Sequence, residues 1–318
     1  MIPTPWLSRA AGRRLAAAVV LAGCGLAGCG LAGVRAEEFR LLAWNVESNR
    51  PSQPPVSDAD VIAGQLTGLL RAEDTRAQIV ALSEVEPKTV ERYRRAVAEG
   101  LGGDVDFVTS ASGGYADSDT LMLVVDTRRF RIDEVFELHR YAGIRANFTV
   151  AEESSSEFGS VRARSPLITR LHDLATGKSF WLITVHLARG EKELRLDQAR
   201  ALRRWAAERD EPIVAAGDFN FDYDFTTGQG NPAFTAMLEE GTWEWLKPDP
   251  LVDSNWSEDR KKGLPGVDSY PDSILDFVFV AHAAKAWHGT SDVIVRTGDF
   301  PDDDRTSDHR PIIATFAP

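Results

Sequence analysis

The residues of this sequence that could carry out chemistry stand at the ends of apolar runs. Gly217-Asp218-Phe219-Asn220 directly follows the apolar residues 212–216. A carboxylate and an amide two residues apart, delivered by a buried strand, can hold a metal-bound water and a phosphoryl oxygen. Aspartate and asparagine are also common in turns, so this segment alone is weak evidence of a site.

Several other apolar runs end in the same way. Their last residues are Trp44-Asn45, Ser83-Glu84, Val185-His186, Leu275-Asp276 and Ser307-Asp308-His309. Carboxylates, amides and imidazoles gathered at strand ends can bind a hard metal ion and move a proton. We therefore expect the fold to bring these strand ends together.

The same apolar runs predict the strands that position these residues. We expect strands over 39–46, 78–82, 107–110, 120–125, 131–139, 161–171, 180–185, 212–216, 274–280, 293–296 and 311–316. Helices are expected to begin at Ser57 or Asp58, near Lys88, after His186 and at Pro232. Both meander and helix-crossover connections occur. The sequence therefore predicts an α+β or α/β fold of two packed mixed β-sheets flanked by helices, a four-layer sandwich.

A long aromatic segment, 221–273, follows the Asp218 region. Apart from a short helix over 232–239, we interpret it as a loop that lies over the site. Its tryptophans could stack on nucleic-acid bases or enter a membrane interface, but packing within the core of the segment is the favoured interpretation for Trp243, Trp245 and Trp256.

Composition indicates a globular protein. Hydrophobic residues make up 43% of the 318 residues and charged residues 26%, and the interior contains neither a repeat nor a Pro/Gly/Ser-rich linker. Residues 1–36 contain four arginines and no acid, which leaves 32 basic against 48 acidic residues in 37–318, a net formal charge of −16. Such a surface repels polyanions and argues against general nucleic-acid coating, although a nuclease with a local basic or metal-filled cleft remains compatible.

The first 36 residues are expected to form an export segment. Three arginines precede the apolar, glycine-containing stretch 15–34. A transmembrane anchor is the alternative, because this stretch is about long enough to span a bilayer. We thus expect an export segment at 1–36 and one catalytic domain at 37–318, which would act as a monomer.

Two routes of export fit this segment. Leu21-Ala22-Gly23-Cys24 and Leu26-Ala27-Gly28-Cys29 both resemble the bacterial lipoprotein box, whose cysteine is acylated and anchors the protein to a membrane. Cleavage after Ala36 would instead release a soluble protein. The expected location is accordingly secreted, periplasmic or lipid-anchored in a bacterial envelope. Because both cysteines lie here, the catalytic domain has neither a disulfide nor a cysteine nucleophile.

The residues at the strand ends, and their order along the chain, resemble those of the endonuclease/exonuclease/phosphatase superfamily. This superfamily includes pancreatic-type deoxyribonucleases, exonuclease III-type repair enzymes and sphingomyelinases. The resemblance covers about 39–318. It rests on Trp44-Asn45, Glu84, Arg164 near Pro166, His186, Gly217-Asp218-Phe219-Asn220, Leu275-Asp276-Phe277 and Ser307-Asp308-His309-Arg310-Pro311. It implies a metal-dependent phosphoric ester hydrolase that uses Mg²⁺, or Mn²⁺, to cleave phosphodiester bonds with a metal-site water attacking in line.

The resemblance also implies roles for individual residues. Glu84 would be the first metal ligand, with Asn45 and Asp308 beside it. Asp218 would orient or deprotonate the attacking water, and Asn220 would donate to the phosphoryl oxygens.

The remaining residues would contact the phosphate or orient those that do. His309 would bind the phosphate, with Asp276 fixing its tautomer and raising its basicity. His186 would be a general acid or a phosphate contact. Arg164 would clamp the phosphate, with Arg162 as a rival for that position.

The substrate is the least determined feature. The segments Phe221-Asp222-Tyr223-Asp224 and Pro271-Asp272-Ser273 differ from the motifs that inositol-polyphosphate phosphatases have at these places. His186 stands where the repair enzymes have tyrosine. Nucleic acid and phospholipid head groups, including sphingomyelin, are the expected partners, and a nuclease-like substrate is favoured. A binding protein without catalytic activity on the same fold is the alternative of a different class.

Overall fold

The chain divides into residues 1–34 and a compact unit from Arg35 to Pro318. The computed structural model describes residues 38–46, 57–110, 119–138, 164–255, 273–300 and 303–318, all within the second unit. The expected export segment and its cysteines, Arg162 and Trp256 lie outside the described residues. No helix among the described residues is long and apolar enough to span a membrane.

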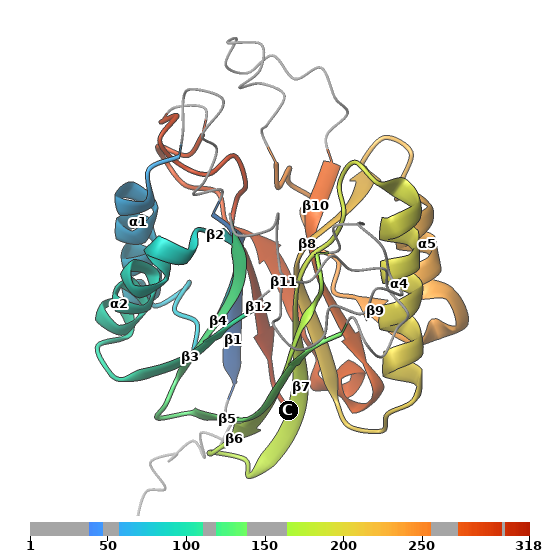
Figure 1. The fold of residues 1–318 in the computed structure, drawn as a ribbon, viewed down its shortest axis with the longest axis horizontal. Coiled ribbons are helices and arrows are strands. Elements are labelled where there is room, and N and C mark those ends of the chain that lie inside the picture. Colours follow the sequence, from blue (N-terminus) through green and yellow to red (C-terminus); the bar gives the residue numbers. More distant parts are fainter. Residues whose placement is uncertain (1–37, 47–56, 111–118, 139–163, 256–272, 301–302) are drawn as a thin grey trace, which may run out of the picture. The chain divides into compact units, whose positions relative to one another are not determined.

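Two six-stranded sheets form the centre of this unit (Figure 1). The first sheet has the strand order β11 (Thr290–Val293), β12 (Ile312–Phe316), β1 (Phe39–Asn45), β2 (Ile79–Val85), β4 (Thr120–Asp126) and β3 (Val105–Thr109). The second has the order β5 (Phe130–Glu137), β6 (Leu167–Asp173), β7 (Lys178–His186), β8 (Ile213–Asp224), β10 (Ser273–Ala281) and β9 (Trp243–Trp245). Parallel pairs β1–β2 and β7–β8 stand among antiparallel ones, so both sheets are mixed as expected.

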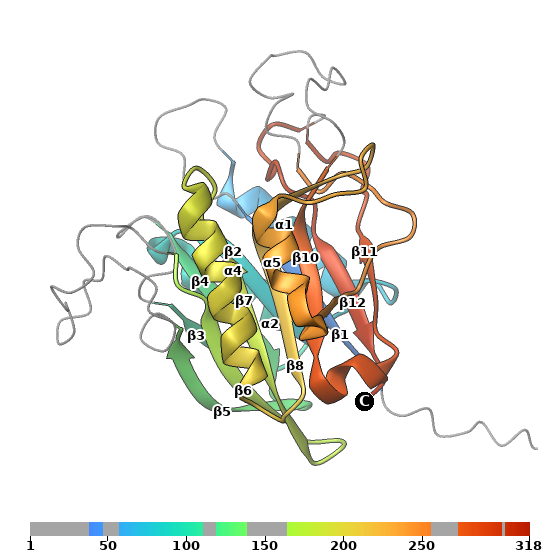
Figure 2. The same ribbon diagram turned by 90° about the vertical axis from the view of Figure 1, so that its right-hand side faces the viewer.

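Helices cover the outer face of each sheet. In the first half of the chain these are α1 (Ala59–Arg71) and α2 (Val90–Leu101), and in the second half α4 (Lys192–Ala207) and α5 (Pro232–Leu238) (Figures 1 and 2). Short 3-10 helices are η1 (Pro87–Thr89), η3 (Glu239–Gly241) and η4 (His282–Trp287). The four-layer α/β sandwich predicted from the sequence is confirmed.

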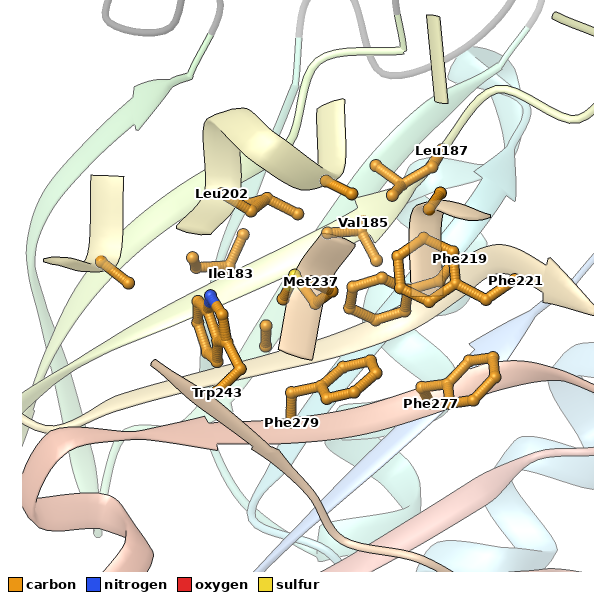
Figure 3. Packing of buried hydrophobic residues seen from close by; sticks show 14 of the residues in the cluster. Ile183, Val185, Leu187, Leu202, Phe219, Phe221, Met237, Trp243, Phe277 and Phe279 are labelled. Carbon is orange, nitrogen blue, oxygen red and sulfur yellow. The ribbon is translucent and has the colours of Figure 1, made fainter. Parts of the chain in front are cut away.

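The apolar residues of the strands alternate between two cores. In β8, Val214 and Ala216 belong to the core between the sheets, whereas Ile213 and Ala215 belong to the core beneath α4 and α5. Strands buried on both faces need apolar residues at successive positions, which is why they read as continuous apolar runs. Figure 3 shows the helix-side core, where the aromatic rings of β8 and β10 pack against Met237 of α5 and Leu202 of α4.

Strand β8 is longer than the sequence indicates. We expected a strand over 212–216 followed by loop, but β8 continues to Asp224, paired with β10. Phe219, Phe221 and Tyr223 alternate on its helix-side face and hold it in the sheet. The alternation of polar and aromatic residues over 218–224 is the pattern of a half-buried strand and was the available signal.

The aromatic segment after β8 is also less irregular than expected. The short helix near Pro232 is confirmed as α5, but Trp243–Trp245 forms the edge strand β9 instead of loop. Trp243 is buried beside α5, and the Trp245 ring packs 5.2 Å from that of Phe277. The core interpretation of these two tryptophans is therefore confirmed. A smaller error concerns the strand expected over 293–296, which is β11 at Thr290–Val293.

Gly217 is required where β8 passes closest to β7. Its φ of 132° is rarely adopted by other residues, and a Cβ atom at this position would overlap the carbonyl oxygen of Val185. Replacing Gly217→Ala should lower the free energy of unfolding by at least about 1–3 kcal/mol, the usual cost of such strain. Gly64→Ala, in the open interior of α1, should instead raise it by about 0.5–1 kcal/mol. Denaturant unfolding of both variants checks the pair, and an unchanged Gly217→Ala protein would contradict this account.

Candidate active site

The structure brings the expected strand-end residues together at one edge of the two sheets. Asn45 is the last residue of β1 and Glu84 stands near the end of β2 in the first sheet. In the second sheet, Asp218 of β8 is paired in register with His186 of β7 on one side and with Asp276 of β10 on the other. His309 lies three residues before β12 begins at Ile312.

Asn45 links the two sheets at this edge. Its amide Nδ2 donates to Asp218 Oδ2 at 3.1 Å and to Glu84 Oε1 at 3.2 Å, and it lies 3.4 Å from His309 Nε2. Asn45 is 1% exposed, so these hydrogen bonds form away from bulk water. The amide therefore fixes the spacing between two carboxylates that would otherwise repel each other.

Glu84 reaches the site through an unusual backbone conformation. Its φ is +56°, and the pairing of β2 with β4 shifts register between Leu82 and Val85. Regular alternation would place position 84 with Leu82, which faces α1 and α2. The irregularity turns the Glu84 carboxylate toward Asn45 and His186 instead.

His309 and Asp276 form a buried hydrogen-bonded pair. The distance from His309 Nδ1 to Asp276 Oδ2 is 2.8 Å, and both side chains are almost fully buried. Burial alone lowers the pKa of His309, but the Asp276 carboxylate, helped by Asp218 and Asp308, outweighs it and raises the pKa to about 10. His309 is consequently an imidazolium at neutral pH, with Nε2 directed toward Asp218 at 3.9 Å.

Asp218 is a carboxylate that lies buried among other carboxylates, an environment that disfavours its charged form. Burial, with repulsion from Asp276 and Glu84, raises the pKa of Asp218 to about 7, although His309 and Arg164 favour its charged form. A carboxylate whose pKa lies near neutrality can exchange a proton at physiological pH.

His186 lies against Arg164. Its Nε2 is in close contact with Arg164 Nη1 and lies 3.3 Å from Glu84 Oε1 and 3.4 Å from Asp218 Oδ2. Burial and the neighbouring guanidinium hold the pKa of His186 well below its usual value. His186 is thus a neutral imidazole that lies beside the guanidinium and two carboxylates. Arg164 also donates to the Leu187 carbonyl at 3.2 Å.

Asn220 completes the segment that follows the apolar part of β8. Its φ is +52°, its Nδ2 donates to the Leu187 carbonyl at 3.1 Å, and its backbone N–H donates to Asp218 Oδ1 at 2.9 Å. The buried Asn220 Oδ1 has no hydrogen-bond partner among the described residues. Asn231, at the start of α5, supports the loop by donating to the Asn220 carbonyl at 2.8 Å.

Three buried residues hold the site residues in position. Ser307 belongs to a motif named above but had no role assigned, whereas Ser254 and Gln198 were not identified from the sequence. Ser254 Oγ accepts from the backbone N–H groups of Leu275 and Asp276 at 2.9 and 3.2 Å. Ser307 Oγ donates to the Asn45 carbonyl at 2.6 Å and accepts from the His309 N–H at 3.0 Å.

Gln198 is the third. It joins the segment of Arg164 to the residues after His186, because its amide donates to the Arg164 carbonyl and accepts from the Ala188 N–H, each at 2.9 Å. Gln198 falls in helical phase with Leu194 and Leu202 on the buried face of α4, and that polar exception was the available signal.

The oxygen atoms near Glu84 suit a hard divalent cation. No group of three or more His, Cys, Asp or Glu side chains in the described part of the chain forms a metal cluster. Mg²⁺ needs only one or two carboxylates, with water and substrate oxygens as its other ligands. Glu84, with 16% of its side chain exposed, and the Asn45 amide offer such a set. Asp308 is fully buried, with Oδ1 3.9 Å from His309 Nε2.

The fold and this arrangement of residues agree with a known family. The model of the Endonuclease/Exonuclease/phosphatase family matches residues 42–309, and the chain belongs to that family. Its members are hydrolases of phosphate esters, among them phosphatases and nucleases. A search of curated proteins finds no match.

Solved structures share the fold at low identity. An endonuclease/exonuclease/phosphatase from Bacteroides vulgatus is 17% identical with a TM-score of 0.60, over 88% of this chain and 98% of the other. Mannosyl-6-phosphatase from Bacteroides thetaiotaomicron is 17% identical, with a TM-score of 0.61 over 87% and 98%. D. rerio TDP2 complexed with a single-strand DNA product is 15% identical, with a TM-score of 0.57 over 88% and 98%.

The buried pair predicts a pH dependence of stability in the metal-free protein. His309 should contribute fully below its ordinary pKa of 6.5 and lose that contribution as pH rises through about 10, because its pKa is raised in the folded state. Asp276→Asn should lower the pKa of His309 and flatten this loss. NMR titration of the imidazole and denaturant unfolding across this pH range check both statements.

Asp292→Asn, at an exposed position of β11, is the matched control and should keep the wild-type profile. An ordinary pKa for His309 with Asp276 in place would contradict the assignment.

Proposed function

We propose that the protein is an exported, divalent-metal-dependent phosphoesterase that hydrolyses phosphodiester bonds, with a nuclease-like substrate. The observation that carries the proposal is the convergence of a buried imidazolium and a carboxylate of near-neutral pKa around the Asn45 amide, with a guanidinium beside the neighbouring His186. Export is supported by the pattern of residues 1–36 alone.

Asp218 is the proposed base. Its pKa of about 7 allows it to accept a proton from the attacking water near neutral pH, and Asn45 holds Oδ2 in place. The Asn220 N–H occupies Oδ1 of the same carboxylate. The carboxylate is thereby fixed before substrate arrives, so little reorganisation accompanies the reaction.

The phosphate would be held by three donors. His309 offers a protonated Nε2, Arg164 offers a guanidinium, and Asn220 retains a second hydrogen on Nδ2 beyond the one given to Leu187. Because His186 is neutral, we assign it a phosphate contact through its ring N–H and not the role of general acid.

Glu84 and Asn45, with Asp308 nearby, are the proposed ligands of Mg²⁺ or Mn²⁺. A bound divalent ion would neutralise negative charge and polarise a phosphoryl oxygen. The site residues comprise four carboxylates and two cations, so one divalent ion brings them to neutrality. A singly charged diester then adds less negative charge than a doubly charged monoester, which supports a diester as substrate.

The nature of the diester is a further part of the proposal. Among the structures that share the fold, one TDP2 is complexed with a DNA product and another protein is a mannosyl-6-phosphatase. Nucleic acid is the substrate class that we propose first, and phospholipid head groups are the alternative. The buried Trp243 and the packed Trp245 lend no support to base stacking.

Activity on a small substrate panel tests the reaction. The purified protein should hydrolyse bis-p-nitrophenyl phosphate and at least one of double-stranded DNA, RNA or sphingomyelin in Mg²⁺ or Mn²⁺, and a chelator should abolish turnover. Asp218→Ala should reduce kcat by about 10²–10⁴-fold, the usual contribution of a positioned base. The matched control Asp292→Ala should remain fully active.

The outcomes separate the alternatives. Turnover that survives Asp218→Ala with the fold intact would reject this mechanism, and Mg²⁺ binding without turnover of any ester would favour a binding protein on the same fold. The preferred member of the panel distinguishes nucleic acid from phospholipid.

Metal binding should also stabilise the fold. Glu84, Asp218 and Asp308 repel one another in the metal-free protein, so Mg²⁺ at about 100 times its Kd should add about 2.7 kcal/mol and raise Tm by several degrees. Glu84→Gln should remove most of this shift, whereas Glu244→Gln on the exposed side of β9 should retain it. Equal shifts in both variants would exclude Glu84 as a ligand.

A further inference from the structure

A cavity of about 480 Å³, lined mostly by polar residue types, lies where β2 leads into η1 and where α1 begins. Helices α1 and α2 pack side by side at this place (Figure 1). The cavity is lined by Ser57, Asp58, Ala59, Glu86, Lys88, Thr89 and Arg92. The proposed catalytic roles use none of these residues.

The cavity adjoins the candidate active site. Glu86 follows Glu84 by two residues, so their Cα atoms are at most about 7 Å apart. On the other side, the Asp58 N–H donates to the Arg305 carbonyl at 2.7 Å, three residues before Asp308. A group bonded to a phosphate in the active site could therefore extend into this cavity.

The lining excludes several kinds of ligand. Its two cations are matched by carboxylates, with Lys88 Nζ 2.5 Å from Glu86 Oε1 and Arg92 Nε 3.0 Å from Asp60 Oδ1, so a polyanion gains little there. The lining contains no aromatic residue for stacking on a base, and Ala59 is its one apolar residue, which does not suit an acyl chain. Alternating charged donors and acceptors suit neutral hydroxyl groups, which both donate and accept.

Ser57 gives a second, independent indication of a ligand. It lines the cavity and is 6% exposed, yet its hydroxyl has no hydrogen-bond partner among the described residues. Buried hydroxyl groups are normally paired, and exceptions often mark places where a ligand or ion binds. The neighbouring Thr89 hydroxyl, by contrast, donates to the Glu86 carbonyl at 2.8 Å.

We propose that this cavity is a subsite for a hydroxyl-rich group, such as a sugar, joined to the phosphate that is cleaved. The proposal rests on the proposed function, because the active site must hold the phosphate. Glu86 accepts from sugar hydroxyls, Lys88 and Arg92 donate to them, and Ser57 does either. The group in the subsite is recognised by its hydroxyls and not by an aromatic base.

Ligand binding tests the subsite without turnover. In the Asp218→Ala protein with Mg²⁺, calorimetry should give glucose 6-phosphate a Kd about tenfold lower than that of inorganic phosphate, which corresponds to about 1.4 kcal/mol. Arg92→Met and Glu86→Gln should each reduce this ratio toward one. Arg94→Met is the matched control on the same helix, because Arg94 pairs with Glu91 and does not line the cavity, and it should keep the tenfold ratio.

Each result either supports or overturns the subsite. Equal affinity for glucose 6-phosphate and phosphate overturns it, as does an equal advantage for phenyl phosphate, whose aromatic ring carries no hydroxyl. Absence of binding by both glucose 6-phosphate and phosphate also overturns it, together with the phosphate site. A sugar-dependent ratio in a protein that hydrolyses no ester would support the subsite while the proposed reaction fails, so the two failures are distinguishable. Melting temperatures of the variants confirm that they fold.

Discussion

The packing of the two sheets face to face determines where the polar residues of this protein meet. In β1, Phe39, Leu41 and Ala43 fill the core between the sheets, and Asn45 continues the same alternation beyond it. His186, Asp218 and Asp276 likewise continue the inward-facing positions of β7, β8 and β10. One geometric rule thus supplies both an apolar core and, at its edge, a polar site with residues from both sheets.

Exclusion of water gives these residues their chemical differences. The desolvated Asp218 carboxylate has a pKa near 7, and the equally buried His309, paired with Asp276, has a pKa near 10. Two neighbouring groups whose pKa values are moved in this way can serve as a base and a cationic donor at the same pH. Asn45 holds this arrangement together because a neutral amide can donate to the carboxylates without adding charge.

The sequence predicted the architecture and the convergence of the site residues, because continuous apolar runs and their polar ends follow directly from strands buried on both faces. Local irregularities could not be predicted. Nothing in the residue types indicates that Glu84 has a positive φ. The longer β8, by contrast, did have a signal, the alternation of polar and aromatic residues over 218–224. The role of Ser254 could not be predicted either. Its hydroxyl accepts hydrogen bonds from the backbone of β10, a segment distant in the sequence, and such contacts leave no pattern in the spacing of residues.

The site reduces the stability of the fold, which argues for a chemical role. Burial and neighbouring carboxylates raise the pKa of Asp218, positive φ angles at Glu84 and Asn220 cost about 1–3 kcal/mol each, and Asn220 Oδ1 and Asp276 Oδ1 lack partners among the described residues. Well-packed apolar residues at such positions would hold two sheets together at least as well. Residues that cost stability at the edge of a well-packed core are expected where a site is kept for its chemistry and not for the fold.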